Sequence, residues 1–133
     1  MALQLEIVTP MQRALATECD EVRLPGAEGS FGVLPGHTSI LSVLKAGALF
    51  MRTGSESHTY ALGEGFAEVS GDHVRVLVEE AQRADEIDLA LAQKQLAEHQ
   101  AKFGSMKSDD PDYDRMRAQV ERAAARALVA TKK

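Results

Sequence analysis

The feature that most constrains the fold is a change of residue periodicity near Arg83. Before it, apolar residues recur at every second position, as in Leu3-Gln4-Leu5-Glu6-Ile7 and Val74-Arg75-Val76-Leu77-Val78. This alternation is typical of β-strands with one buried face. After Arg83, glycine nearly disappears and alanine, glutamine, leucine, lysine, glutamate and arginine dominate, all of which are good helix formers. The sequence therefore predicts an α+β chain in which a β-rich part precedes a helical part.

Short apolar runs divide the first part into many strands. Turn-forming residues separate the runs, namely Gly47, Thr53-Gly54-Ser55, Gly63-Glu64-Gly65 and Ser70-Gly71-Asp72. Besides the two alternating runs, we expect strands near residues 22–24, 40–44, 48–52, 58–62 and 66–69. Many short strands at this spacing predict an N-terminal antiparallel β-sandwich over residues 1–84.

The second part is predicted to form two helices that pack as an antiparallel hairpin over residues 85–133. The first helix has one apolar stripe at helical spacing, made of Leu89, Ala92, Leu96, His99 and Phe103. Asp85 and Glu86 are placed in its first turn, where the helix dipole favours negative charge. After Gly104-Ser105 and a polar break at residues 108–112, a second stripe follows, made of Tyr113, Met116, Val120, Ala123 or Ala124, and Ala127. Alanine-rich stripes bury little apolar area, so we expect a weakly packed and mobile hairpin.

Composition narrows the possible functions. The formal net charge of −5 argues against nucleic-acid or anionic-membrane binding. A single cysteine, Cys19, excludes an intramolecular disulfide and a multi-cysteine metal site. No apolar run approaches the roughly 18 residues of a membrane span, and the N-terminal residues do not resemble a signal peptide. We expect a soluble, cytosolic protein unless it is recruited to a larger assembly.

The sequence predicts no catalytic residues and no metal site. The four histidines, at positions 37, 58, 73 and 99, lack the spacing of zinc ligands, and no serine-nucleophile elbow is present. Glu79-Glu80 is placed on a strand, where neighbouring side chains point to opposite faces and cannot act as a carboxylate pair. Asp109-Asp110 is placed in a loop, and no basic neighbour lowers the pKa of Cys19.

A segment rich in glycine and proline carries the most specific pattern. Residues 24–37 read Leu-Pro-Gly-Ala-Glu-Gly-Ser-Phe-Gly-Val-Leu-Pro-Gly-His. They predict a strand end, a tight turn, a short apolar strand at 31–34 and a second turn at Pro35-Gly36, because Pro-Gly pairs suit type II turns. The string resembles one that recurs in the epsilon subunit of bacterial and chloroplast rotary ATP synthases. Shorter segments resemble the same family in the same order: Val8-Thr9-Pro10, Lys45-Ala46-Gly47, Gly65-Phe66-Ala67-Glu68-Val69 and Ala84-Asp85-Glu86-Ile87-Asp88.

The resemblance implies a non-catalytic subunit of a rotor. Such a subunit couples the gamma subunit to the membrane ring of c subunits, at the cytoplasmic face of the bacterial inner membrane. In the family, one end of the sandwich faces both partners, so Glu28, Ser30 and His37 become contact candidates. Ser30 stands where the family has a second acidic residue, which weakens a charged contact there.

The resemblance also implies that the hairpin inhibits ATP hydrolysis by extending toward the catalytic beta and alpha subunits. Basic residues concentrate after Asp114, and we expect Arg115, Arg122 and Arg126 to anchor the extended state. A solvated helix face is the alternative for these arginines.

Some family members bind ATP on the hairpin. Ile87, Asp88, Ala92, Arg122 and Arg126 match that motif, but Leu91 replaces an arginine, so we expect no nucleotide cofactor.

Two other classes of function stay open on the residues alone. A small sandwich that binds a carbohydrate or peptide would explain the strands, but not the ordered motifs. A small hydrolase has no residues in its favour.

Overall fold

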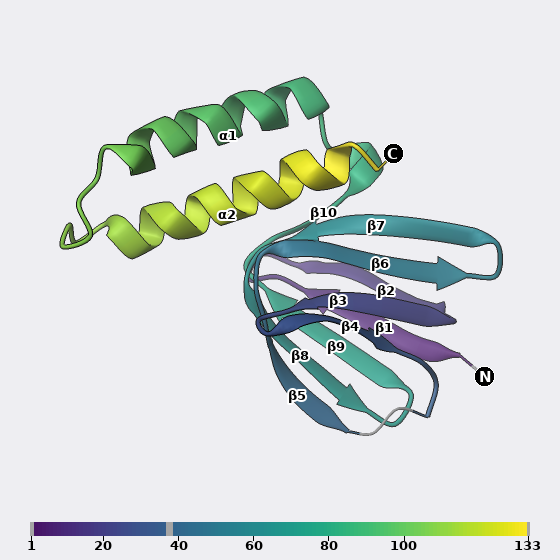
Figure 1. The fold of residues 1–133 in the computed structure, drawn as a ribbon. Helices are drawn as coiled ribbons and strands as arrows, with labels where there is room; N and C mark the ends of the chain where they lie inside the picture. Colours follow the sequence, from purple (N-terminus) through teal and green to yellow (C-terminus); the bar gives the residue numbers. More distant parts are fainter. Residues whose placement is uncertain (1, 37–38, 133) are drawn as a thin grey trace.

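The computed structural model describes residues 2–36 and 39–132, which form a β-sandwich followed by two helices (Figure 1). Within these residues the strands are β1 (Leu3–Val8), β2 (Arg13–Cys19), β3 (Glu21–Gly26), β4 (Gly29–Val33), β5 (Ile40–Leu44), β6 (Gly47–Thr53), β7 (Glu56–Leu62), β8 (Gly65–Ser70), β9 (His73–Val78) and β10 (Ala81–Arg83). A 3-10 turn, η1 (Ala84–Glu86), leads into the helices α1 (Leu89–Gly104) and α2 (Tyr113–Ala130). The predicted α+β architecture is confirmed.

The strands form one hydrogen-bonded sheet that folds over on itself. Its order is β10-β7-β6-β3-β5-β8-β9-β1-β2, and β4 pairs with β3. Strand β2, at one end of this order, lies beside β6, so the two layers enclose a common core. Between the strands described above, pairing is antiparallel except that β1 runs parallel to β9. Alternation within a strand carries no information on the direction of its neighbour, so the sequence did not predict this parallel pair.

The core consists of the inward-facing residues of the alternating strands. Leu3, Leu5 and Ile7 on β1 are at most 2 % exposed, and Val74 and Val76 on β9 are at most 1 % exposed. Each fully buried side chain of this size stabilises the fold by roughly 2 kcal/mol relative to an exposed one. The predicted inward faces of these two strands are therefore confirmed.

The glycine- and proline-rich segment folds as expected in part. The turn at Pro35-Gly36 is present, and Gly36 has a φ of 83°, which a residue with a side chain rarely adopts. The first turn, however, lies at Ala27-Glu28, while Pro25-Gly26 belongs to β3. Gly26 is needed there for space, because a Cβ on it would lie 2.6 Å from the carbonyl oxygen of Gly29 across the pair of strands. Strands β2 and β10 were not predicted.

The entry to the first helix differs from the prediction. Asp85 and Glu86 belong to η1 and not to α1. The helix begins at Leu89, and the side chain of Asp88 caps it by accepting a hydrogen bond from the backbone N–H of Leu91 at 3.0 Å. The predicted end at Gly104 is confirmed.

The hairpin packs against the sandwich through α2, which lies between α1 and the strands (Figure 1). Val129 and Ala130 on α2 are buried in a small cluster with Ala61 of β7, Ile87 and Ala92. Ala92 and Ala127 of the predicted stripes take part in this cluster, but the buried positions Val129 and Ala130 of α2 were not predicted. At the far end of the hairpin, the rings of Phe103 and Tyr113 lie 4.8 Å apart and hold the two helices together.

Candidate interaction surfaces

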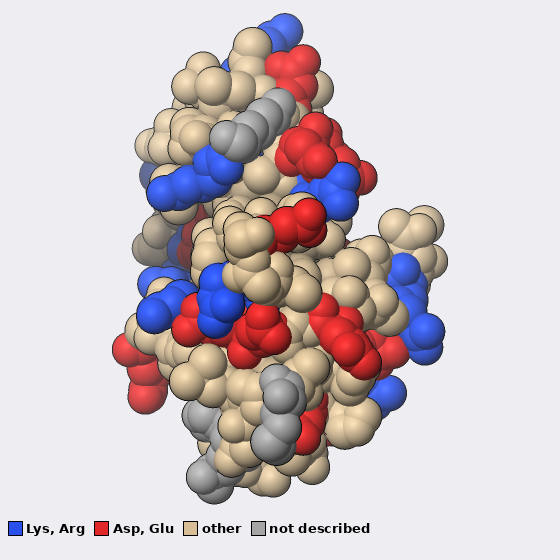
Figure 2. Space-filling view, turned by 90° about the vertical axis from the view of Figure 1, so that its right-hand side faces the viewer, with Lys and Arg blue, Asp and Glu red and all other residues tan. Residues whose placement is uncertain are grey.

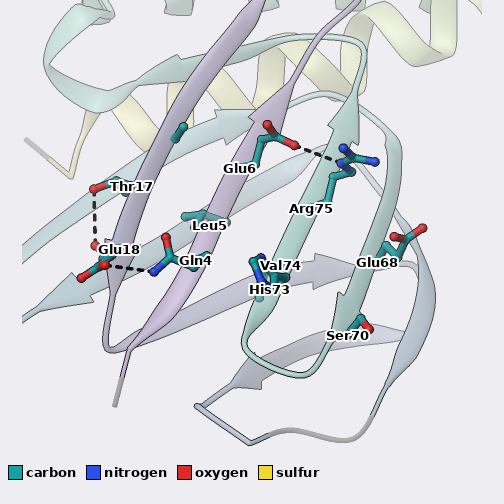
Figure 3. A pocket seen from close by; sticks show the side chains of 11 residues that line it. Gln4, Leu5, Glu6, Thr17, Glu18, Glu68, Ser70, His73, Val74 and Arg75 are labelled. Atoms are coloured by element: carbon teal, nitrogen blue, oxygen red, sulfur yellow. Dashed lines mark hydrogen bonds and ion pairs between the residues drawn. The ribbon is translucent and has the colours of Figure 1, made fainter.

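A hollow of about 660 Å³ lies on the outer face of β1, β2, β8 and β9 (Figure 3). Four of its polar side chains form two pairs. Gln4 Nε2 donates to Glu18 Oε1 at 3.0 Å, and Arg75 Nε donates to Glu6 Oε1 at 3.0 Å. The hollow is therefore a polar surface with an excess of carboxylates, because Glu18 and Glu68 line it beside the Glu6–Arg75 pair.

The reactive residue types are dispersed over the fold. Cys19 is fully buried at the end of β2, and burial raises the pKa of its thiol, which disfavours the reactive thiolate. His58 and His73 are exposed on β7 and β9, and His99 is half-buried on α1. Among residues 2–36 and 39–132, no three metal-ligating side chains gather into a potential metal site. Burial favours a structural role for Cys19.

The sequence placed Glu79-Glu80 on a strand, and this prediction is wrong. The two residues connect β9 to β10, and this break in the strand lets Glu80 turn toward α2. The pair again provides no carboxylate dyad, because the carboxylate of Glu80 is engaged by Arg126.

An exposed apolar row crosses three adjacent strands of the sandwich. It consists of Leu41 and Val43 on β5, Phe66 on β8 and Leu77 on β9, and each of these side chains is 39–72 % exposed. Val43 lies opposite Phe66, and Phe66 lies opposite Leu77, so these three form a line across the strands. A contiguous apolar surface of this kind is typical of a protein–protein contact.

Charged side chains lie directly beside the apolar row on the same face. Glu68 lies opposite Leu41 on one side and Arg75 on the other, and Arg75 pairs with Glu6. An apolar centre with a polar margin is the usual composition of a protein interface. Elsewhere, on the face shown in Figure 2, acidic and basic side chains are interspersed rather than gathered by sign.

The turn between β3 and β4 presents two of the predicted contact residues to solvent. Glu28 lies in the turn and Ser30 on β4, and both are exposed. A groove of about 600 Å³, lined by Glu28, Ser30, Leu41 and Val43, connects this turn with the apolar row. The third predicted contact residue, His37, lies outside the described residues.

The three predicted anchor arginines have different environments. Arg115 is exposed and pairs at 3.3 Å with Asp112, the residue that precedes α2. Arg122 instead reaches the sandwich, where its Nε and Nη2 donate to the two carboxylate oxygens of Glu64 at 2.8 and 2.9 Å. Arg126 donates to Glu80, and its side chain is only 17 % exposed. The solvated-face alternative is therefore wrong for Arg122 and Arg126, and it describes Arg115.

The contact with Arg122 also changes the acidity of Glu64. Hydrogen bonds from the guanidinium hold the pKa of the Glu64 carboxyl below its usual value, and the same contact raises the pKa of Arg122. Both groups are thus held in their charged forms at neutral pH. Sequence reasoning missed Glu64 and Glu80 as partners, because they lie 58 and 46 positions from Arg122 and Arg126.

The predicted nucleotide residues come together only in part. A hollow of about 370 Å³ beside the start of α1 is lined by Glu80, Glu86, Ile87, Asp88, Leu91 and Arg126, among others. Arg122 does not line it, because its guanidinium is turned to Glu64. The remaining cation, Arg126, is neutralised by Glu80, and the hollow contains two further carboxylates. Its charge disfavours a polyphosphate.

Comparisons with known proteins agree with this architecture. Residues 2–84 match the family model described as the β-sandwich domain of the ATP synthase delta/epsilon chain. The chain is 45 % identical over 131 residues to the ATP synthase epsilon chain of Geotalea uraniireducens, covering 98 % of this chain and 94 % of that one. It is 43 % identical over 128 residues to ATP synthase epsilon chain 2 of Syntrophotalea carbinolica, covering 96 % and 93 % of the two chains.

Solved structures extend the similarity to the complete chain. A chain from a Euglena gracilis mitochondrial ATP synthase structure, which contains OSCP, F1 and the c-ring, superposes with a TM-score of 0.81 at 25 % identity. The alignment covers 99 % of this chain and 82 % of that one. No helix among the described residues is both long and apolar enough to span a membrane. The sandwich, the hairpin and these relatives together show that the chain belongs to the family of ATP synthase epsilon subunits, which are non-catalytic accessory subunits.

Proposed function

We propose that this protein is a rotor subunit of the central stalk that transmits rotation between the gamma subunit and the membrane ring of c subunits. The observation that carries the proposal is the apolar row, Leu41, Val43, Phe66 and Leu77, which leaves large side chains uncovered on a stiff sandwich. A rotor contact must transmit force without deforming, and a closed β-sandwich supplies that stiffness. The solved relative from Euglena gracilis is part of an assembly that includes a c-ring, which supports the same placement.

In this proposal, two neighbouring surfaces of the sandwich contact different partners. The apolar row docks on gamma, while the turn at Glu28 and Ser30 approaches the polar loops of the ring. Glu28 carries the charged contact, since Ser30 has no charge. His37 remains a predicted gamma contact. In this arrangement the protein works at the cytoplasmic face of the bacterial inner membrane, held there by its partners.

The hairpin is the regulatory element in this proposal. In the docked form Arg122 and Arg126 face the sandwich. In an extended form, α2 reaches the alpha and beta subunits and restrains ATP hydrolysis, with Arg115, Arg122 and Arg126 placed near acidic residues of the catalytic head. Exposure of Arg115 in the docked form leaves it available for a first contact.

Binding to gamma is the direct test. The full chain is mixed with purified gamma subunit of the same organism, and the complex is measured by size-exclusion chromatography and calorimetry. We expect a tight one-to-one complex, because an apolar contact with a polar margin excludes water well. No complex at micromolar concentrations would contradict the placement on the rotor.

Truncation after residue 84 tests the division of roles. We expect residues 1–84 to keep a cooperative thermal transition and to bind gamma, because among the described residues the main core contains none beyond Ala81. In the assembled enzyme the truncation should raise ATP hydrolysis. A truncated chain without a cooperative transition would contradict the two-unit organisation. Unchanged ATP hydrolysis would contradict inhibition by the hairpin, and transmission of rotation between gamma and the ring would be the one remaining role.

Nucleotide binding is expected to be absent at micromolar ATP. Leu91 supplies no guanidinium, a loss of about 1–3 kcal/mol or roughly ten- to hundredfold in affinity for a charge-assisted contact. Calorimetry with the full chain measures this, and Leu91→Arg should strengthen whatever binding exists. Micromolar affinity of the natural chain for ATP would show the expectation to be wrong.

A further inference from the structure

We infer that Glu64 and Glu80 form a latch that holds the helical hairpin on the sandwich without a ligand, by occupying the guanidinium groups of Arg122 and Arg126. The inference concerns the docked state of the isolated chain, and it stands whether or not the hairpin inhibits hydrolysis.

The sandwich presents the two carboxylates side by side. Glu64 lies in the turn between β7 and β8, and Glu80 lies between β9 and β10. Reciprocal backbone hydrogen bonds join the two connections, from Gly63 N–H to the carbonyl of Glu80 at 2.9 Å and from Glu79 N–H to the carbonyl of Glu64 at 3.1 Å. Two distant stretches of sequence therefore form one rigid acidic edge that faces the hairpin.

The flanking glycines make this close approach possible. A Cβ on Gly63 would lie 3.2 Å from both the backbone nitrogen and the Cγ of Glu80. A Cβ on Gly65 would overlap the backbone of β9. The sequence Gly63-Glu64-Gly65 thus combines a carboxylate with two small residues, of which Gly63 allows close packing against Glu80 and Gly65 allows close packing against β9.

The two arginines meet this edge from successive turns of α2. Positions 122 and 126 are four residues apart and lie on one helix face. Arg122 makes a two-pronged contact with Glu64, and Arg126 contacts Glu80, with side-chain exposures of 28 % and 17 %. Charge-assisted pairs of this geometry are stronger than exposed ones, because partial burial reduces screening by solvent.

The apolar part of the docking surface is small, which makes the ion pairs important. The buried cluster between hairpin and sandwich contains four alanines, Ala61, Ala84, Ala92 and Ala130, beside Ile87 and Val129. Alanines contribute little burial free energy, so the two charged contacts decide how firmly α2 is held. Since salt screens such contacts, docking should weaken as ionic strength rises.

Amide hydrogen exchange of the full chain, read by mass spectrometry, tests the latch. An undocked alanine-rich hairpin frays, so the amides of α2 report docking while those of β1 and β9 report global unfolding. Glu64→Gln or Glu80→Gln should each accelerate exchange in α2 by roughly fivefold, since a partly buried charged pair is lost, and the double variant should accelerate it further. High salt should bring the natural chain closer to the variants.

Matched variants distinguish the latch from a general effect of charge. Glu121→Gln removes an exposed carboxylate that pairs with Arg117 on the same helix, and it should leave exchange unchanged. The charge exchange Glu64→Arg with Arg122→Glu should restore protection of α2. Two results would overturn the inference. One is that α2 exchanges as slowly in Glu64→Gln and Glu80→Gln as in Glu121→Gln. The other is that exchange in β1 and β9 accelerates as much as exchange in α2.

Discussion

Replacing Phe66 by glutamate is expected to leave the sandwich folded and to weaken association with gamma by roughly thirtyfold or more, since a central hot-spot residue contributes at least about 2 kcal/mol. Phe66 is 51 % exposed in the free chain, so the substitution places a charge in water rather than in the core. In a complex, the same charge would be buried in the middle of the apolar row without a partner. Calorimetric titration of purified gamma with the variant measures the loss.

Leu128→Glu is the matched control for this experiment. Leu128 is 54 % exposed, similar to Phe66, but it lies on α2 and outside the apolar row. Affinity for gamma should therefore stay unchanged in Leu128→Glu. Equal affinities of the two variants would show that the apolar row does not contact gamma.

Replacing Gly65 by alanine is expected to destabilise the sandwich strongly, although it adds only one methyl group. A Cβ at this position would lie 1.9 Å from the carbonyl oxygen of Leu77 and 2.8 Å from the Cα of Val78. Both are backbone atoms of β9, so the pairing of β8 with β9 must distort. We expect a loss of about 3 kcal/mol, which corresponds to a fall in melting temperature of roughly 15 °C for a domain of this size.

Gly104→Ala provides the control for the added methyl group. Gly104 ends α1, and a Cβ there meets no atom within 4 Å. Alanine is also the better helix former by up to about 1 kcal/mol, so the melting temperature should stay the same or rise slightly. Thermal unfolding followed by circular dichroism compares the two variants, and similar melting temperatures would contradict the steric argument.

The strands that could be predicted are those with one buried and one exposed face. β1 and β9 alternate strictly, because one face of each is in the core and the other is in water. β2 was missed because its burial pattern is less regular: only Cys19 of its residues is fully buried. β10 has three residues, all half-buried, and its pairing with β7 follows from the path of the chain rather than from any local pattern.

The apolar stripe predicted for α2 also describes only part of what is buried. Met116 and Ala123 of the predicted stripe are buried in the structure. Ala125 and Val129 are buried as well but were not predicted, and Val129 lies in a cluster that includes Ala61 of the sandwich. Periodicity can show that a helix has an apolar side, but it cannot show that a polar side with arginines is also covered.

Candidate contact residues were predictable to different degrees. Glu28 and Ser30 were found through an ordered set of short motifs, and their exposed positions follow from a local turn. The apolar row was not predicted, because its members come from three strands and become neighbours only through the register of β5, β8 and β9.

The sequence by itself determined the α+β class, the change from strands to helices near residue 84, the end of α1 at Gly104 and the family, because each depends on residues that are close in the chain or on ordered motifs. Only the tertiary structure decided the parallel pairing of β1 with β9, the apolar row and the contact of Arg122 and Arg126 with Glu64 and Glu80. Each of these joins residues that are distant in sequence, and 58 positions separate Arg122 from Glu64. Such contacts depend on where the backbone brings two segments together, which local patterns do not encode.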